Sequence, residues 1–341
     1  MPAPNEQDPH HGHGHEHGHE HGHEHATGLR GWMQSVFRPH SHDSADSVDS
    51  ALESSARGIR ALKVSLVALL ATAVLQGLVV AFSGSVALLA DTVHNLSDAG
   101  TAIPLWIAFW LSWRPANRRF TYGYGRAEDL AGLFVVLMIA ASAVVAGLEA
   151  VRRLLDPVPV HNLGWVATAG VIGFLGNEAV ALYRIRVGRD IGSAALVADG
   201  LHARTDGLTS LAVVAGAVGV ALGFPLADPI VGLAIMVAIL FVLRSAVRDV
   251  FARLMDAVDP ALIDAAERSL AATNGVESVT RVRMRWIGHR LHADADLIVN
   301  RHASAVDAHE VAHRAEAALT MTVPKLTAAV VHAYPGAEAL R

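Results

Sequence analysis

The sequence contains no cysteine among its 341 residues. It therefore has neither a disulfide framework nor a thiolate metal site. Charged residues are also scarce, because they make up 17% of the chain whereas 52% of it is hydrophobic. That balance is too apolar for one water-soluble domain. The net charge of −5 is small and spread along the chain, so it gives no reason to expect a nucleic acid partner.

No cleavable signal peptide is expected, since the N-terminus is polar and rich in His and the first apolar run begins near residue 61. The chain instead has six long, mostly apolar runs, at about 61–82, 86–112, 127–149, 163–185, 190–222 and 226–243. A helix needs about 20 apolar residues to cross about 30 Å of hydrocarbon. We therefore expect six transmembrane helices, in a multi-pass protein of the cell membrane.

The basic residues beside these runs predict the orientation of the helices. Most of them lie before the first run, between the second and third runs, between the fourth and fifth runs and after the sixth run, which are all on one side of the membrane. They are Arg57, Arg60, Lys63, Arg114, Arg118, Arg119, Arg126, Arg184, Arg186, Arg189, Arg244 and Arg248. The other side receives Arg152 and Arg153, between the third and fourth runs. Because Lys and Arg collect on the cytoplasmic side, both termini are expected in the cytoplasm.

The N-terminal residues 1–56 are predicted to form a disordered cytoplasmic tail, because no apolar face repeats in them. Residues 10–25 hold nine His, mostly as His-Gly-His-Glu. Such tracts bind late transition metals weakly, so the tail is interpreted as a metal buffer or delivery segment. A solvated tail or an appended tag is the alternative. The transport domain is expected at 57–248 and a cytoplasmic domain at 249–341.

The pattern of the last 90 residues changes to that of a small α+β domain. It predicts helices over Pro260–Ala272 and Ala305–Leu319 and strands over Thr280–Trp286, Leu291–Val299 and Thr327–His332. The resulting order is α-β-β-α-β, with helices on one face of a sheet.

Two distant segments share the pattern A-D-x-x-H-x-x-x-D-x-x-T, at Ala90–Thr101 and Ala198–Thr209. Both lie within predicted transmembrane helices, where ionisable side chains usually mark an ion or substrate path. Residues at i, i+3, i+4 and i+7 share one helix face, so each segment carries a polar stripe. The four central ligands are His94, Asp98, His202 and Asp206.

Two imidazoles and two carboxylates can close a tetrahedral site of the kind that Zn²⁺ favours. The same ligands suit Co²⁺, Ni²⁺, Fe²⁺ and Mn²⁺. Asp91 and Asp199, one turn earlier, are interpreted as acceptors for the imidazoles, as entry groups or as polar packing. Asn177 and Glu178 in the fourth run are expected to pair with Arg204 or with a backbone group.

These residues resemble the cation diffusion facilitator family, over about 60–335. The resemblance rests on the paired H-x-x-x-D motifs and on Phe120–Glu128, Asp228-Pro229, Leu254-Met255-Asp256, Ala308-His309-Glu310 and Val331-His332. It implies a homodimeric metal–proton antiporter with six helices and a ferredoxin-like cytoplasmic domain in each subunit. It also implies that the transport site falls on His94, Asp98, His202 and Asp206, as in the zinc-type branch, although cobalt and nickel exporters share this pattern.

Some positions depart from the family pattern. Phe120 and Tyr124 stand where some members have His, so a second metal site before the third helix is expected to be absent. The basic and acidic side chains of 121–128 are expected to meet lipid headgroups or the cytoplasmic domain.

In the cytoplasmic domain, His292, Asp296, His309 and His332 are candidates for an ion at the dimer interface. The alternative is that these histidines are merely exposed.

The sequence therefore predicts an exporter of a divalent cation, with zinc favoured, that works by alternating access in exchange for protons. No catalytic cofactor is expected. A membrane metalloenzyme would need a metal-bound water and a general base, typically in H-E-x-x-H, and that motif is absent. A metal sensor that binds without transport is a third class.

Overall fold

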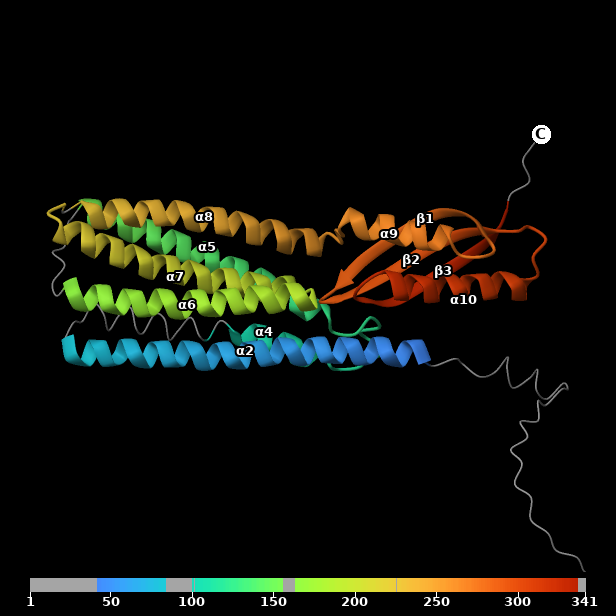
Figure 1. Ribbon diagram of the computed structural model, residues 1–341, viewed down its shortest axis with the longest axis horizontal. Helices are drawn as coiled ribbons and strands as arrows, with labels where there is room; N and C mark the ends of the chain where they lie inside the picture. Colours follow the sequence, from blue (N-terminus) through green and yellow to red (C-terminus); the bar gives the residue numbers. More distant parts are fainter. Residues whose placement is uncertain (1–41, 84–99, 101, 156–162, 225, 337–341) are drawn as a thin grey trace, which may run out of the picture. The chain divides into compact units, whose positions relative to one another are not determined.

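The computed structural model describes residues 42–83, 100, 102–155, 163–224 and 226–336. Within these ranges the helices of the membrane domain are α2 His42–Ser83, α4 Ala102–Ser112, α5 Arg126–Leu155, α6 Leu163–Ile191, α7 Ala194–Ala221 and α8 Ala227–Leu254. They are followed by α9 Pro260–Ala271, β1 Val276–Ile287, β2 Arg290–Val299, α10 Ala305–Thr322 and β3 Leu326–Pro335. Figure 1 shows this division into long helices and a mixed α+β part. The predicted class of a helical membrane protein with an additional α+β domain is confirmed.

Four of the described helices are long and apolar enough to cross a membrane, over Leu52–Val79, Arg126–Leu155, Leu163–Ile191 and Ala227–Leu254. They correspond to the first, third, fourth and sixth predicted spans. The fifth predicted span is α7, which is 28 residues long and carries both acidic and basic side chains. Of the second span, the described part is α4, because residues 84–99 and 101 lie outside the described residues.

The helix α2 begins at His42, so the prediction of disorder is wrong for residues 42–56. Residues 1–41 lie outside the described part of the chain. The physical reason is that Ala51, Leu52 and Glu53 are good helix formers, so the helix extends to the N-terminal side of the apolar run that begins near residue 61. The start of the apolar run therefore does not mark the start of the helix.

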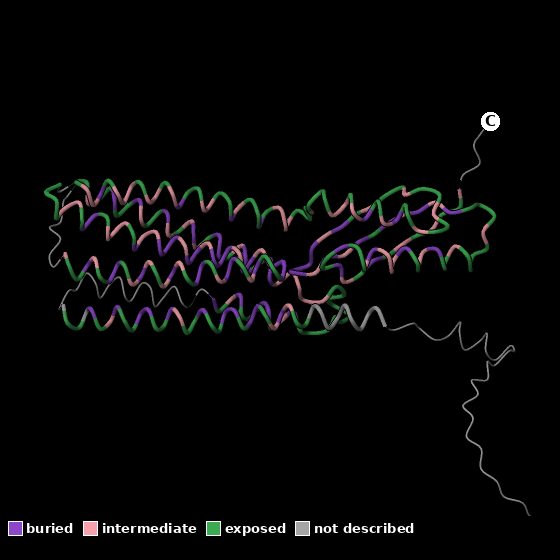
Figure 2. The backbone as a smooth tube through the Cα atoms, viewed as in Figure 1, coloured by how far each residue is buried: buried purple, intermediate pink, exposed green. Residues whose placement is uncertain are grey.

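The long helices pack side by side, α6 against α7 and α2, and α8 against α5 and α7 (Figure 1). Val135 and Ile139 of α5 pack with Ile239 and Ala246 of α8, all buried. Exposed residues recur along the whole of α8 (Figure 2). Among them Phe241 is 68% exposed. A face of this kind suits a hydrocarbon environment, in which apolar side chains need no protein cover.

The α+β domain contains one sheet with strand order β1-β2-β3. β1 and β2 are antiparallel, and β3 runs parallel to β2 after the crossover through α10. Residues of β2 alternate, so Leu291, Ala293, Ala295 and Leu297 are buried against the helices and the even-numbered residues face the other side. The predicted order α-β-β-α-β is confirmed, and β1 begins four residues before the predicted start at Thr280.

Candidate functional site

The helix α7 carries one half of the predicted metal site. It begins after Ser193, whose hydroxyl accepts a hydrogen bond of 3.0 Å from the Leu196 amide and so caps the helix. His202 and Asp206 follow, one turn apart on the same face of α7, and their side chains are 2% and 6% exposed. The Nδ1 atom of His202 lies 3.9 Å from Oδ1 of Asp206. One nitrogen and one oxygen ligand therefore stand close together, within a helix of the membrane domain.

The other half of the predicted site lies outside the described residues. His94, Asp98 and the nearby Asp91 all fall within 84–99. The four-ligand set stays a prediction for this reason. Among the described residues, no three His, Asp or Glu side chains gather closely enough to hold a metal ion.

The carboxylate of Asp199 is paired with a basic residue of the neighbouring helix. Nη1 of Arg184, on α6, lies 2.9 Å from Oδ2 of Asp199, and the two side chains are 2% and 0% exposed. The sequence predicts Asp199 as an acceptor for the imidazoles, as an entry group or as polar packing. The structure gives this carboxylate a cationic partner in Arg184, which the sequence predicts only as a basic residue beside the fourth apolar run.

A second ion pair joins α6 and α7 beside the polar stripe. Arg204 donates to both carboxylate oxygens of Glu178, over 3.1 Å from Nε and 2.7 Å from Nη2. Both side chains are about one-third exposed or less. The predicted pairing of Glu178 with Arg204 is confirmed. Two ion pairs therefore fix how α7 is turned against α6, and with it the direction in which the His202 face points.

The candidate residues of the α+β domain lie on different surfaces. Asp296 of β2 and His332 of β3 are neighbours in the sheet register, and His292 is on the same helix-free face of β2. His309 belongs to α10, where its ring contacts that of His313 at 4.7 Å between centroids.

The charged groups beside these candidates already interact with one another. Nη2 of Arg281 lies 2.6 Å from Oδ2 of Asp296, so the two side chains form an ion pair. The pKa of His292 is lowered by burial and by the positive charges of Arg285 and Arg290. A neutral imidazole is available to a metal, but a metal ion would have to displace Arg281 from the Asp296 carboxylate.

The chain matches two family descriptions in succession. Residues 62–255 match the cation efflux transmembrane domain, and residues 258–335 match the cytoplasmic domain of cation efflux proteins. This protein belongs to the cation efflux family. It is therefore a transporter of metal cations and not an enzyme, and its α+β part is the cytoplasmic domain of that family.

Relatives support the same assignment. A probable cation efflux system protein of Mycobacterium tuberculosis is 64% identical over 308 residues, which cover 90% of this chain and 93% of the relative. The cation-efflux pump FieF of Salmonella newport is 28% identical over 76% of this chain and 89% of its own length. The magnetosome protein MamB of Magnetospirillum gryphiswaldense is 27% identical over 73% and 84%.

Proposed function

We propose that this cation efflux protein exports a divalent transition-metal cation, zinc by preference, in exchange for protons. The observation that carries the proposal is the buried pair of His202 and Asp206, one turn apart on α7. An imidazole and a carboxylate suit Zn²⁺, and also Co²⁺, Ni²⁺ and Fe²⁺. His94 and Asp98 carry the same spacing in the sequence and are proposed to complete the site.

Proton exchange follows from the chemistry of these ligands. A metal binds neutral imidazole and ionised carboxylate, so protons and metal compete for the same lone pairs. We propose that the metal loads from the cytoplasm and that protonation of a His and an Asp expels it on the other side. Movement of helices around a fixed site would expose the ligands to each side in turn.

Asp91 and Asp199 are proposed as supporting residues outside the ligand set. The contact that favours this role for Asp199 is its ion pair with Arg184, which ties α7 to α6 three residues before His202. The sequence motif places Asp91 at the equivalent position before His94.

The remaining parts of the proposal concern the assembly. The protein is proposed to be a homodimer through its cytoplasmic domain, with both termini in the cytoplasm. The divisions 1–56, 57–248 and 249–341 are proposed as tail, transport domain and cytoplasmic domain, with residues 42–56 of the tail forming the first turns of α2. An ion bound between two subunits would use His292, Asp296 and His332 from the helix-free sheet face, with His309 from α10.

Transport by the full-length protein in proteoliposomes tests the site. Under a pH gradient we expect wild-type protein to move Zn²⁺ against protons, and His202→Ala or Asp206→Asn to abolish this flux. His302→Ala is the matched control, because His302 is an exposed histidine of the cytoplasmic domain. Normal flux in both site variants would refute the ligand assignment. Stoichiometric metal binding without flux in the wild type would favour a sensor.

A further inference from the structure

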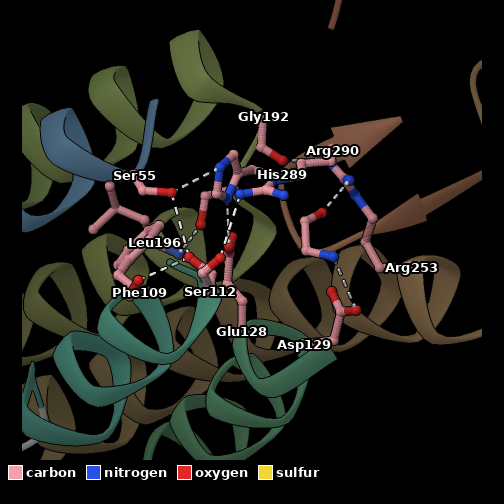
Figure 3. Close-up of polar contacts among 12 residues, drawn as sticks. Ser55, Phe109, Ser112, Glu128, Asp129, Gly192, Leu196, Arg253, His289 and Arg290 are labelled. Atoms are coloured by element: carbon pink, nitrogen blue, oxygen red, sulfur yellow. Dashed lines mark hydrogen bonds and ion pairs between the residues drawn. The ribbon is translucent and has the colours of Figure 1, made fainter. Parts of the chain in front are cut away.

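The turn between β1 and β2 is buried, which is unusual for a two-residue connection. It consists of Gly288 and His289, and His289 is 4% exposed. Turns of soluble domains generally lie at the surface and face water. Here the turn is packed against the ends of membrane helices (Figure 3).

Two glycines allow the backbones to approach. Gly288 has φ = 61°, and a Cβ there would lie 2.7 Å from the carbonyl oxygen of Gly125. A Cβ on Gly125, directly before α5, would lie 2.9 Å from the carbonyl oxygen of Ile287. A side chain on either glycine would therefore separate the turn from α5.

The imidazole of His289 connects several helices. Its Nδ1 lies 2.8 Å from Oε2 of Glu128 on α5, and its Nε2 lies 3.1 Å from Oγ of Ser55 on α2. Ser55 Oγ in turn lies 3.3 Å from Oγ of Ser112, the last residue of α4. Figure 3 shows these four side chains converging. We refer to His289, Glu128, Ser55 and Ser112 as the turn junction.

Charged residues surround the turn junction from α5, α8 and β2. Asp129 accepts a hydrogen bond of 3.4 Å from the Gly288 amide. Arg253 of α8 donates to the Gly288 carbonyl over 3.3 Å and to the Gly192 carbonyl over 2.7 Å. Arg290 donates to the Ser112 carbonyl over 3.3 Å. The turn is thus held through both its backbone and its side chains.

The position of these contacts in the chain links them to both halves of the proposed transport site. Ser112 is the last residue of α4, and His94 and Asp98 precede α4 in the sequence. Gly192 directly precedes Ser193, the residue that caps α7, and α7 carries the other half. A movement of the β1–β2 turn would therefore act on the end of α4 and on the start of α7, the helix that carries His202 and Asp206.

We propose that His289 is a positioning residue for transport, which acts through Glu128 and Ser55. The inference rests on the proposed transport function. A contact influences alternating access if it is stronger in one conformation than in the other. Glu128 is 1% exposed, and a buried carboxylate that loses its hydrogen-bond donor is costly. The conformation with the turn docked is therefore favoured, and the cytoplasmic domain sets how readily the helices leave it.

The test compares full-length variants in proteoliposomes, with Zn²⁺ as the probe. His289→Phe keeps a ring beside Phe109 but removes both ring nitrogens, and His289→Gln keeps a donor and an acceptor. We expect His289→Phe to change the maximal rate of metal–proton exchange by about fivefold or more, while KM stays within about twofold. His289→Gln should recover most of the wild-type rate. His302→Phe, at an exposed position, should behave as wild type.

An unchanged maximal rate in His289→Phe would overturn the proposal, as would a change confined to KM. If His289→Phe does not fold, Ser55→Ala removes one hydroxyl from the turn junction. It is expected to shift the maximal rate about twofold with the same KM, and wild-type kinetics in this variant would also overturn the proposal. Absence of exchange in wild-type vesicles refutes the proposed function itself. Normal wild-type exchange with an unaffected His289→Phe refutes the positioning role alone.

Discussion

Replacing Arg184 by Met removes the positive partner of a carboxylate that is completely buried between α6 and α7. The two charges are 2.9 Å apart, and the side chains are 2% and 0% exposed. At an effective dielectric constant of about 20, their gross attraction is about 6 kcal/mol. Because an unpaired buried charge keeps its desolvation cost, we expect Arg184→Met to lower the free energy of unfolding by about 3–5 kcal/mol.

Replacing the partner carboxylate, in Asp199→Leu, should lower the free energy of unfolding by less than Arg184→Met does. The flexible stem of an arginine near a helix end can carry its guanidinium to the interface, whereas a short aspartate cannot move away. The double variant should be nearly as stable as the wild type. Nε and Nη2 of Arg184 have no hydrogen-bond partner among the described residues. The ion pair therefore offsets only part of the desolvation cost of burying the two charges.

These free energies can be measured by unfolding the detergent-solubilised protein with increasing SDS, followed by tryptophan fluorescence. Transport need not be intact for this measurement. A loss below about 1 kcal/mol in Arg184→Met would show that the pair is solvated and refute the reasoning. The double variant could instead lose as much free energy of unfolding as the two single variants lose together. That result would refute the view that an uncompensated charge causes the loss in each single variant.

Four further changes test other parts of the structure. Ser193→Ala removes the cap of α7 and should lower the stability by about 1 kcal/mol, measured by the same SDS titration. Leu297→Ala opens a cavity in the core of the cytoplasmic domain and should cost about 2–5 kcal/mol, whereas Val330→Ala, at a residue 62% exposed, should be almost neutral. Since burial lowers the pKa of His292, the midpoint of its NMR titration should lie below 6.5. The contribution of neutral His292 to the free energy of unfolding should be present above pH 6.5 and be lost as the pH falls through the lowered pKa. A midpoint above 6.5 would contradict this. Deletion of residues 1–26 should leave transport intact and change at most the apparent metal affinity, and loss of flux would assign the tail a direct part.

The apolar runs predict the membrane helices because insertion in lipid depends on the segment itself and not on its partners. Alternation in Leu291–Val299 likewise predicts β2, which the structure begins one residue earlier, at Arg290. The sequence does not predict the start of α2 at His42, because a polar helical extension has no periodic apolar face. Local pattern therefore predicts the elements, but it predicts their ends less well.

The contacts of the site were harder to predict. Asp199 and Arg184 belong to different helices, and the rotation of one helix against the other decides whether they meet. His289 and Glu128 are 161 positions apart, and neither stands out in its own segment. For residues 121–128 the sequence left lipid headgroups or the cytoplasmic domain as partners. The structure places Glu128 against the cytoplasmic domain.

The mutual approach of Gly125 and Gly288 has a practical consequence for engineering the protein. Connections such as these are usually where insertions, epitope tags and fluorescent reporters are tolerated. Here the segment before α5 and the β1–β2 turn pack directly against each other, so a residue added to either would displace both. The turn at Arg301–Ala303, which is exposed or half-buried and lies between β2 and α10, is the better insertion point for a probe of the cytoplasmic domain.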